Sequence, residues 1–234
     1  MSESIAAPQF LRPIRSFVRR CGRLTLAQKN AFTELWPKWG LELCASSSDM
    51  PAIFGRQAPL IFEIGFGMGH SLVAMAEGEP DKDFIGVDVH QPGIANLLLE
   101  IDRRQLNNCR IFAADAHDVL KQVIPDQTLD RIQLFFPDPW PKKRHHKRRI
   151  VQSSFLELIH QKMKPGAVFH AATDWQEYAD YMLTLLEADP GFKNVYKVGE
   201  FSPRPAERPL TKFEQRGQRL GHGVWDLIYT RIEK

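Results

Sequence analysis

The fold is decided by the stretch Leu60-Ile61-Phe62-Glu63-Ile64-Gly65-Phe66-Gly67-Met68-Gly69-His70. Its first five residues are typical of a buried strand, and a helical pattern follows the last glycine. Glycines at alternate positions allow a tight turn that brings the backbone close to a ligand at the start of the helix. The stretch therefore predicts a strand, a ligand-binding turn and a helix, which is the opening unit of a Rossmann-like sheet.

Outward from this unit, apolar strands alternate with helices. Further continuous apolar runs predict buried parallel strands at residues 84–89, 110–114, 131–136 and 167–172. Apolar residues share one helical face in two of the intervening segments, Ile94 with Leu97, Leu98 and Ile101, and Val151 with Phe155, Leu158 and Ile159. This order predicts an α/β protein with a doubly wound, mostly parallel sheet whose site lies at the carboxyl ends of the strands. Two last strand candidates, 195–201 and 224–232, have no convincing helix between them and predict an antiparallel C-terminal finish.

Residues 1–57 precede this alternating pattern and are interpreted as an N-terminal arm, which leaves 58–234 as the domain. The first 23 residues are polar and basic. Thr25 and Gln28 have the spacing of a capping box, which predicts a helix that continues to Trp36. Pro37 is expected to end that helix.

The composition is that of an ordinary globular protein, with 43% hydrophobic and 25% charged residues in a chain of 234. No apolar run approaches the roughly 18 to 20 residues that a membrane-spanning helix needs. Cys21, Cys44 and Cys109 lie far apart and form no Cys-x-x-Cys pair, which favours reduced thiols over a disulfide frame or a zinc site. We therefore expect a cytoplasmic protein without membrane or metal, and both a monomer and a homodimer remain open.

Positive charge is concentrated in one run. The residues from Lys142 to Arg149, here called the basic ridge, carry a formal charge of +6, which leaves −3 for the rest of a chain whose total is +3. Cations this close repel one another, so the run indicates an anionic partner rather than a solvated helix start. A sparser basic set follows near the C-terminus, at Arg204, Arg208, Lys212, Arg216 and Arg219.

Acidic residues accompany the ends of consecutive predicted strands. Glu63 leads into the turn formed by Gly65, Gly67 and Gly69; Asp88 ends the second strand, and Asp115 follows the third. Asp88 is placed to accept hydrogen bonds from ribose hydroxyls and Asp115 from an adenine amino group, so we expect a nucleoside ligand. The Gly-x-Gly-x-Gly spacing favours S-adenosylmethionine over a nicotinamide dinucleotide. The charge of Glu63 favours it too, because it would repel a pyrophosphate but not a cationic methionine portion.

Asp138 is the candidate catalytic residue. It lies between Pro137 and Pro139 after the fourth strand, and two prolines restrict the backbone so that the carboxylate is held in one place at the rim. Trp140 follows with a flat face suited to a base, directly before the basic ridge. A rigid turn and a packed aromatic are the ordinary interpretations of these residues taken singly, and their joint placement favours a site.

These segments resemble the bacterial tRNA (guanine-N7)-methyltransferase family, from about residue 58 to the C-terminus. The resemblance is carried by Glu63 to Gly69, Asp88, Asp115, Pro137 to Arg149, Thr173-Asp174-Trp175, and Thr211 to Glu214 with Arg216, Gly217, Gly221 and His222. The Phe-Pro-Asp-Pro-Trp-Pro-Lys-Lys-Arg string, residues 136–144, is the most specific of these motifs. Asp88 departs from the many members that have Glu, and its shorter side chain reaches less far toward a ribose.

The resemblance implies a class I methyltransferase fold and transfer of a methyl group from S-adenosylmethionine to N7 of a guanine in the variable loop of tRNA. The cofactor would be contacted by the glycine turn and by Glu63, Asp88, Asp115 and Asp138, and Asp138 would also be catalytic. Substrate contacts would come from Lys142, Asp174, Thr211, Lys212, Phe213 and Glu214. Contacts to the nucleic acid are expected from Lys143, Arg144, Lys147, Arg148 and Arg149.

Three other functions are compatible with parts of the pattern. A nicotinamide-dependent oxidoreductase would share the glycine turn, but we find no candidate residue for hydride transfer. An amino methyltransferase would carry an Asp/Asn-Pro-Pro-aromatic motif, which the order Pro137-Asp138-Pro139-Trp140 matches only faintly. A non-catalytic RNA-binding protein with the same fold would need the basic ridge but not Asp138.

Overall fold

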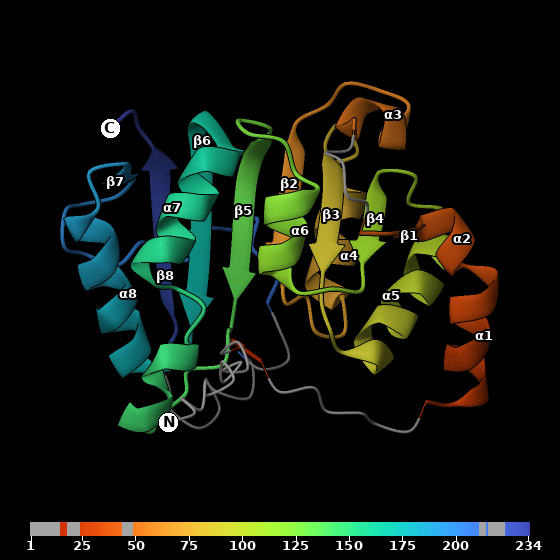
Figure 1. The fold of residues 1–234 in the computed structure, drawn as a ribbon, viewed down its shortest axis with the longest axis horizontal. Helices are drawn as coiled ribbons and strands as arrows, with labels where there is room; N and C mark the ends of the chain where they lie inside the picture. Colours follow the sequence, from red (N-terminus) through yellow and green to blue (C-terminus); the bar gives the residue numbers. More distant parts are fainter. Residues whose placement is uncertain (1–14, 18–23, 44–48, 211–213, 215–222) are drawn as a thin grey trace, which may run out of the picture.

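One sheet organises the residues that the computed structural model describes, namely 15–17, 24–43, 49–210, 214 and 223–234. Its parallel strands are β2 (Leu60–Ile64), β3 (Asp83–Val87), β4 (Cys109–Phe112), β5 (Leu129–Phe135) and β6 (Met163–Thr173). The two last strands are β7 (Phe192–Asn194) and β8 (Trp225–Arg231). β8 lies between β6 and β7 and runs antiparallel to both (Figure 1). The expected α/β fold, mostly parallel with an antiparallel C-terminal strand, is confirmed.

The strand order is β1-β4-β3-β2-β5-β6-β8-β7. From β2 the chain builds outward to β3 and β4, then returns to place β5 on the other side of β2 and builds outward again. The carboxyl ends of β2 and β5 therefore lie where the winding direction reverses. In open α/β sheets ligands bind in the crevice at such a switch point.

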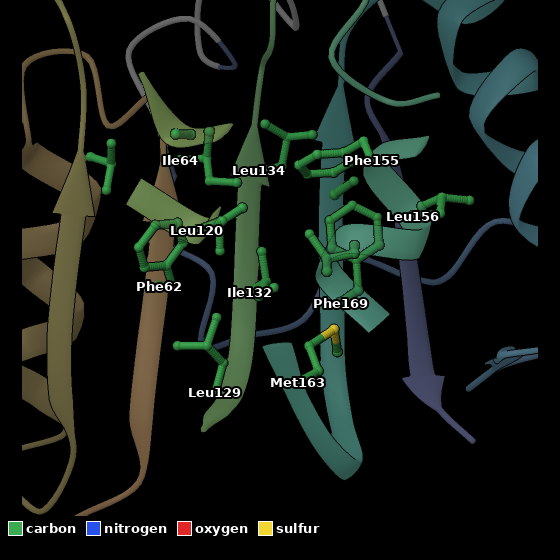
Figure 2. Packing of buried hydrophobic residues seen from close by; sticks show 14 of the residues in the cluster. Phe62, Ile64, Leu120, Leu129, Ile132, Leu134, Phe155, Leu156, Met163 and Phe169 are labelled. Atoms are coloured by element: carbon green, nitrogen blue, oxygen red, sulfur yellow. The ribbon is translucent and has the colours of Figure 1, made fainter. Parts of the chain in front are cut away.

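Helices cover both faces of the sheet. One hydrophobic cluster joins it to α6 (Ala116–Gln122), α7 (Ser153–Lys162) and α8 (Gln176–Ala188), and a second joins it to α4 (His70–Gly78) and α5 (Gln91–Arg104). Figure 2 shows the first cluster, in which Phe169 of the sheet packs against Phe155 of α7 and Phe62 of β2 lies beside Leu120 of α6. Because β2 is buried on both faces, its residues form a continuous apolar run interrupted only by Glu63.

The C-terminal region differs from the sequence prediction. The structure places β7 at Phe192–Asn194, and residues 195–201 form no strand beyond it. The side chain of Asn194 ends the strand, because its Oδ1 accepts from the Tyr196 backbone N–H at 2.9 Å and its Nδ2 donates to the Glu200 carbonyl at 3.1 Å. An asparagine that binds the backbone on its own C-terminal side favours a turn over a continuing strand.

The described part of the arm packs on the domain. The capping box of α1 (Leu26–Glu34) is confirmed, but α1 ends before Pro37, which instead lies in the first turn of α2 (Trp36–Trp39). Proline fits there because the first turn of a helix needs no intrahelical N–H donor. β1 (Gly40–Leu41) then pairs in parallel with β4, and α3 (Met50–Phe54) precedes β2. The boundary at residue 57 stays a prediction.

Candidate active site at the carboxyl edge of the sheet

The turn after β2 has the backbone conformation that its glycines predict. Gly65, Gly67 and Gly69 have φ values of 73°, 59° and 78°, which residues with a Cβ rarely adopt. The Gly65 N–H donates to the Val87 carbonyl at 2.8 Å, so the turn is fixed to the end of β3. At Gly93 of α5, an added Cβ would lie 1.9 Å from the Gly67 carbonyl oxygen, so α5 begins directly against the turn.

Asp88 lies directly after β3 and accepts hydrogen bonds from three backbone N–H groups. The Gly67 N–H donates to Oδ2 at 2.8 Å, and those of Val89 and His90 donate to Oδ1 at 2.6 and 2.8 Å. Burial raises the pKa of Asp88 above its usual value, although these three hydrogen bonds oppose the rise. Asp88 therefore holds the glycine turn in shape as well as facing the cavity.

Asp115 is the N-cap residue of α6, where its Oδ1 accepts from the His117 backbone N–H at 3.0 Å. Its burial alone would raise the pKa, but the side chain and backbone of His117 outweigh burial and hold the pKa of Asp115 below its usual value. Asp115 is therefore an anion at neutral pH. The expected position after the third parallel strand is the observed one.

Asp138 follows β5 after a strained residue. Phe136 has φ = 53°, and its N–H donates to the Ala172 carbonyl of β6 at 2.7 Å. A left-handed non-glycine residue costs about 1 to 3 kcal/mol and persists only where the surroundings hold it. The strain redirects the chain away from the sheet, so that Pro137 and Asp138 lie on the wall of the cavity.

A cavity of about 220 Å³ lies at this edge of the sheet. Asp88, Asp115 and Asp138 line it together with Gly65, while Phe135 and Phe136 supply apolar wall. Its described lining, which also includes Ser16 and Phe17 of the arm, contains no lysine, arginine or histidine. We call it the acidic cavity. Within the described residues no cluster of histidine, cysteine or carboxylate side chains is arranged to hold a metal ion.

Glu63 is not among the lining residues of the acidic cavity. Its side chain is buried within β2, and its Oε2 has no hydrogen-bond partner. Burial raises the pKa of Glu63 to about 8, and the nearby charge of Asp88 adds to the rise. The expected anion is therefore a neutral acid at pH 7, and the acidic character of the cavity comes from the aspartates.

The basic ridge forms a short 3-10 helix, η1 (Lys143–Arg148), between β5 and α7. Lys142, Lys143, Arg144 and Lys147 are exposed, as a contact to a polyanion requires. The Trp140 ring is not an open stacking surface, because the Arg148 guanidinium lies over it at 5.0 Å and His145 packs against its edge. Trp140 Nε1 also donates to the Ser16 carbonyl at 3.1 Å, which joins the loop before the ridge to the arm.

Arg149 is the member of the basic ridge that the structure turns inward. Its side chain is 1% exposed, and it donates to the Pro139 carbonyl at 2.9 Å and to Glu177 at 3.0 Å. Its guanidinium also lies over the rings of Tyr178 and Tyr181 of α8. This geometry does not fit the predicted phosphate contact; Arg149 fixes the loop after Asp138 instead.

The predicted substrate residues fall into three groups. Lys142 is exposed beside Pro141, and Asp174 follows β6 at the same edge of the sheet as Asp138. Thr211, Lys212 and Phe213 lie outside the described residues. Glu214 is buried, and both of its carboxylate oxygens accept from Arg208, so the structure gives it an internal partner instead of the expected substrate-facing position.

The sequence prediction missed three contributors to the site. Gly93 and Asn96 of α5 fix the glycine turn, the latter by donating to the Met68 carbonyl at 2.8 Å. Phe136 shapes the cavity wall. The available signal for Gly93 was a glycine in the first turn of a helix that follows Asp88, the acid predicted to bind ribose. Nothing in the sequence marks a left-handed phenylalanine.

An open sheet in this order, with the antiparallel strand β8 beside β6, is the class I methyltransferase fold. The fold is that of a 16S rRNA methyltransferase, KamB (TM-score 0.58, 15% identity, 80% of this chain and 95% of that one), and of the aminoglycoside resistance methyltransferase NpmB1 (TM-score 0.55, 18% identity, 82% and 95%). A family model described as "Putative methyltransferase" matches residues 57–227.

Closer relatives identify the family. A tRNA (guanine-N(7)-)-methyltransferase of Pseudomonas paraeruginosa is 55% identical over 223 residues, which are 95% of this chain and 91% of that protein. One of Shigella boydii is 52% identical over 239 aligned positions that cover both chains completely. The chain belongs to the tRNA (guanine-N7)-methyltransferase family. No helix among the described residues is both long and apolar enough to span a membrane.

Proposed function

We propose that this protein transfers a methyl group from S-adenosylmethionine to N7 of a guanine in tRNA, and that the guanine lies in the variable loop. The names of the relatives support the reaction. The observation that carries the proposal for this chain is the acidic cavity, whose described lining combines three aspartates with no cationic side chain. An anionic pocket favours a cationic sulfonium donor and disfavours the pyrophosphate of a dinucleotide.

The residues around the cavity fit S-adenosylmethionine. Asp88 accepts backbone hydrogen bonds, but a carboxylate has lone pairs left for ribose hydroxyls. Asp115 stands beside the apolar walls that an adenine ring needs, and an added Cβ on Gly65 would meet nothing within 4 Å, so space is open over the turn. When bound, the donor supplies an electrophilic methyl group on a positively charged sulfur.

The reaction requires little acid–base catalysis by the protein. Guanine N7 carries a free lone pair, so no proton has to be removed before it attacks a methyl group. The protein must align the guanine and stabilise the positive charge that develops on its imidazole ring. Asp138, held between two prolines at the cavity wall, would do both. This role is consistent with a cavity whose described lining holds no nucleophile–histidine pair.

The surface next to the cavity suits RNA. A second hollow of about 470 Å³ shares Ser16, Asp115 and Ile150 with the acidic cavity and is bordered by Lys121, Lys147 and Arg148. Phosphates docked there would place a nucleotide at the mouth of the acidic cavity. In an RNA helix N7 lies in a deep, narrow groove beyond the reach of side chains, so the target guanine should lie in a loop or irregular region.

The proposed reaction is tested with two transcripts of one tRNA, the second made with 7-deazaguanosine in place of guanosine. We expect labelled methyl transfer to the first and none to the second, because the second lacks N7. Equal labelling of both would show a different target atom. Calorimetric titration with S-adenosylhomocysteine and with NADH tests the cofactor separately, since binding of NADH alone would overturn it.

A further inference from the structure

Four charged or titratable side chains form a buried cluster behind the acidic cavity. Arg208 donates to Glu214 through Nη1 at 2.7 Å and Nη2 at 2.9 Å, and to Asp226 of β8 through Nη2 at 3.0 Å. Asp226 Oδ1 also lies 2.7 Å from His170 Nε2 of β6. The side chains of Arg208, Glu214 and Asp226 are each 1% exposed. The sequence pattern groups Arg208 with a sparse basic set, so its burial is a finding of the structure.

The buried cluster touches the strained end of β5. The Arg208 guanidinium lies over the Phe136 ring, 5.8 Å from its centroid, and His170 packs edge-on against Phe135 at 4.9 Å. Asp226 is the antiparallel partner of Ala172, whose carbonyl accepts the Phe136 N–H. The ring of Phe136 therefore contacts Arg208 of the cluster. Its backbone N–H is bonded to β6, the strand that pairs with β8 and carries His170 of the cluster.

We propose that Arg208, oriented by Asp226 and Glu214, is a positioning residue that braces Phe136 in its left-handed conformation and thereby places Asp138. This inference rests on the proposed role of Asp138 in methyl transfer. Arg208 is not itself among the described residues that line the cavity. Its effect on the reaction runs through Phe136, which lies two residues before Asp138 and forms part of the cavity wall.

The chemistry of the cluster suits a brace. A guanidinium is planar and rigid, so it can donate to two carboxylates and still present a flat face to an aromatic ring. A lysine would keep the buried positive charge but would lose that face and the paired donors. Arg208→Lys therefore removes the contact with the Phe136 ring but keeps a positive charge beside the two buried carboxylates. The variant thus tests the contact without leaving those carboxylates buried without a cation.

The test is a double-mutant cycle on kcat, measured with saturating unmodified tRNA and S-adenosylmethionine, using Arg208→Lys, Phe136→Leu and the double variant. We expect each single variant to lower kcat at least tenfold, while the Kd of S-adenosylhomocysteine changes less than threefold for Arg208→Lys. In the Phe136→Leu background, Arg208→Lys should lower kcat less than threefold, because there is no aromatic ring left to brace. Arg204→Lys is the matched control, since Arg204 also pairs with Glu214 but is 37% exposed, and we expect its kcat within twofold of wild type.

Three results would overturn the inference. They are a wild-type kcat in Arg208→Lys, a wild-type kcat in Phe136→Leu, and losses that multiply in the double variant as they do for independent sites. Phe136→Leu removes none of the hydrogen bonds within the buried cluster, so it decides the matter even if the arginine variant is poorly stable. Failure of the proposed function is distinguishable, because the wild-type protein itself would then transfer no methyl group to tRNA.

Discussion

Glu63→Gln tests whether the acid beneath the glycine turn is neutral in the folded protein. The pKa of Glu63 is raised from 4.5 to about 8, chiefly by burial. Between these two values the folded state keeps a proton that the unfolded state has lost, so stability falls as the pH rises. This loss in the free energy of unfolding is small below pH 4.5 and reaches its full size above pH 8. A tenfold difference in proton affinity between the two states corresponds to about 1.4 kcal/mol, so the loss grows by about 3 to 4 kcal/mol between pH 5 and pH 8.

Glutamine has nearly the same shape and does not titrate, so the variant should escape this loss. Urea unfolding at pH 5, 6, 7 and 8 should show the free energy of unfolding of Glu63→Gln rising relative to wild type by about 3 to 4 kcal/mol over that range. Titrating groups that do not interact with Glu63 are common to the two proteins and cancel in the difference. Glu157→Gln, an exposed change on α7, is the control and should follow the wild-type curve. Parallel curves for wild type and Glu63→Gln would refute the reasoning.

The other predictions concern the site and its partners. Asp138→Ala should abolish turnover while S-adenosylhomocysteine still binds measurably by calorimetry, and a near-normal rate would remove its assigned role. Lys143→Ala combined with Arg144→Ala should weaken tRNA binding and lower the slope of log affinity against log salt by about 1 per lost phosphate contact; an unchanged slope would mean that the ridge faces away from RNA. Gly93→Ala should weaken cofactor binding at least tenfold, because its Cβ would collide with the Gly67 carbonyl, whereas Gly78→Ala in open space should bind normally.

The fold could be predicted because it rests on local patterns. Buried parallel strands form continuous apolar runs and the glycine turn has its own spacing, so the predicted boundaries of β2 to β6 agree within a few residues, apart from the early start of β6 at Met163. The antiparallel C-terminal finish is confirmed, but its first strand was predicted at 195–201 and lies at Phe192–Asn194, because one side chain, Asn194, decides where β7 ends. β1 has only two residues, and its pairing with β4 depends on tertiary contacts that no local pattern reports.

Site residues could be predicted where their place at the end of a strand brings them to the site. They could not be predicted where neighbouring side chains decide whether a charged side chain is buried or exposed. Asp88, Asp115 and Asp138 follow strand ends, and the structure brings them to one cavity. The charge of the basic ridge predicts an outside contact for Arg149, and the family resemblance predicts one for Glu214, yet α8 and Arg208 hold the two side chains inside. The side chains of Arg and Glu are long enough for either outcome, and only their neighbours decide between them.

The central claim is that a guanine N7 in tRNA accepts the methyl group at the acidic cavity. Its most direct measurement is labelled methyl transfer to total tRNA that lacks the modification, followed by borohydride reduction and aniline scission to locate the product. We expect cleavage at a single guanosine, in the variable loop, that appears with wild-type protein and is lost with Asp138→Ala. Label in tRNA that resists scission, or cleavage that persists without Asp138, would contradict it.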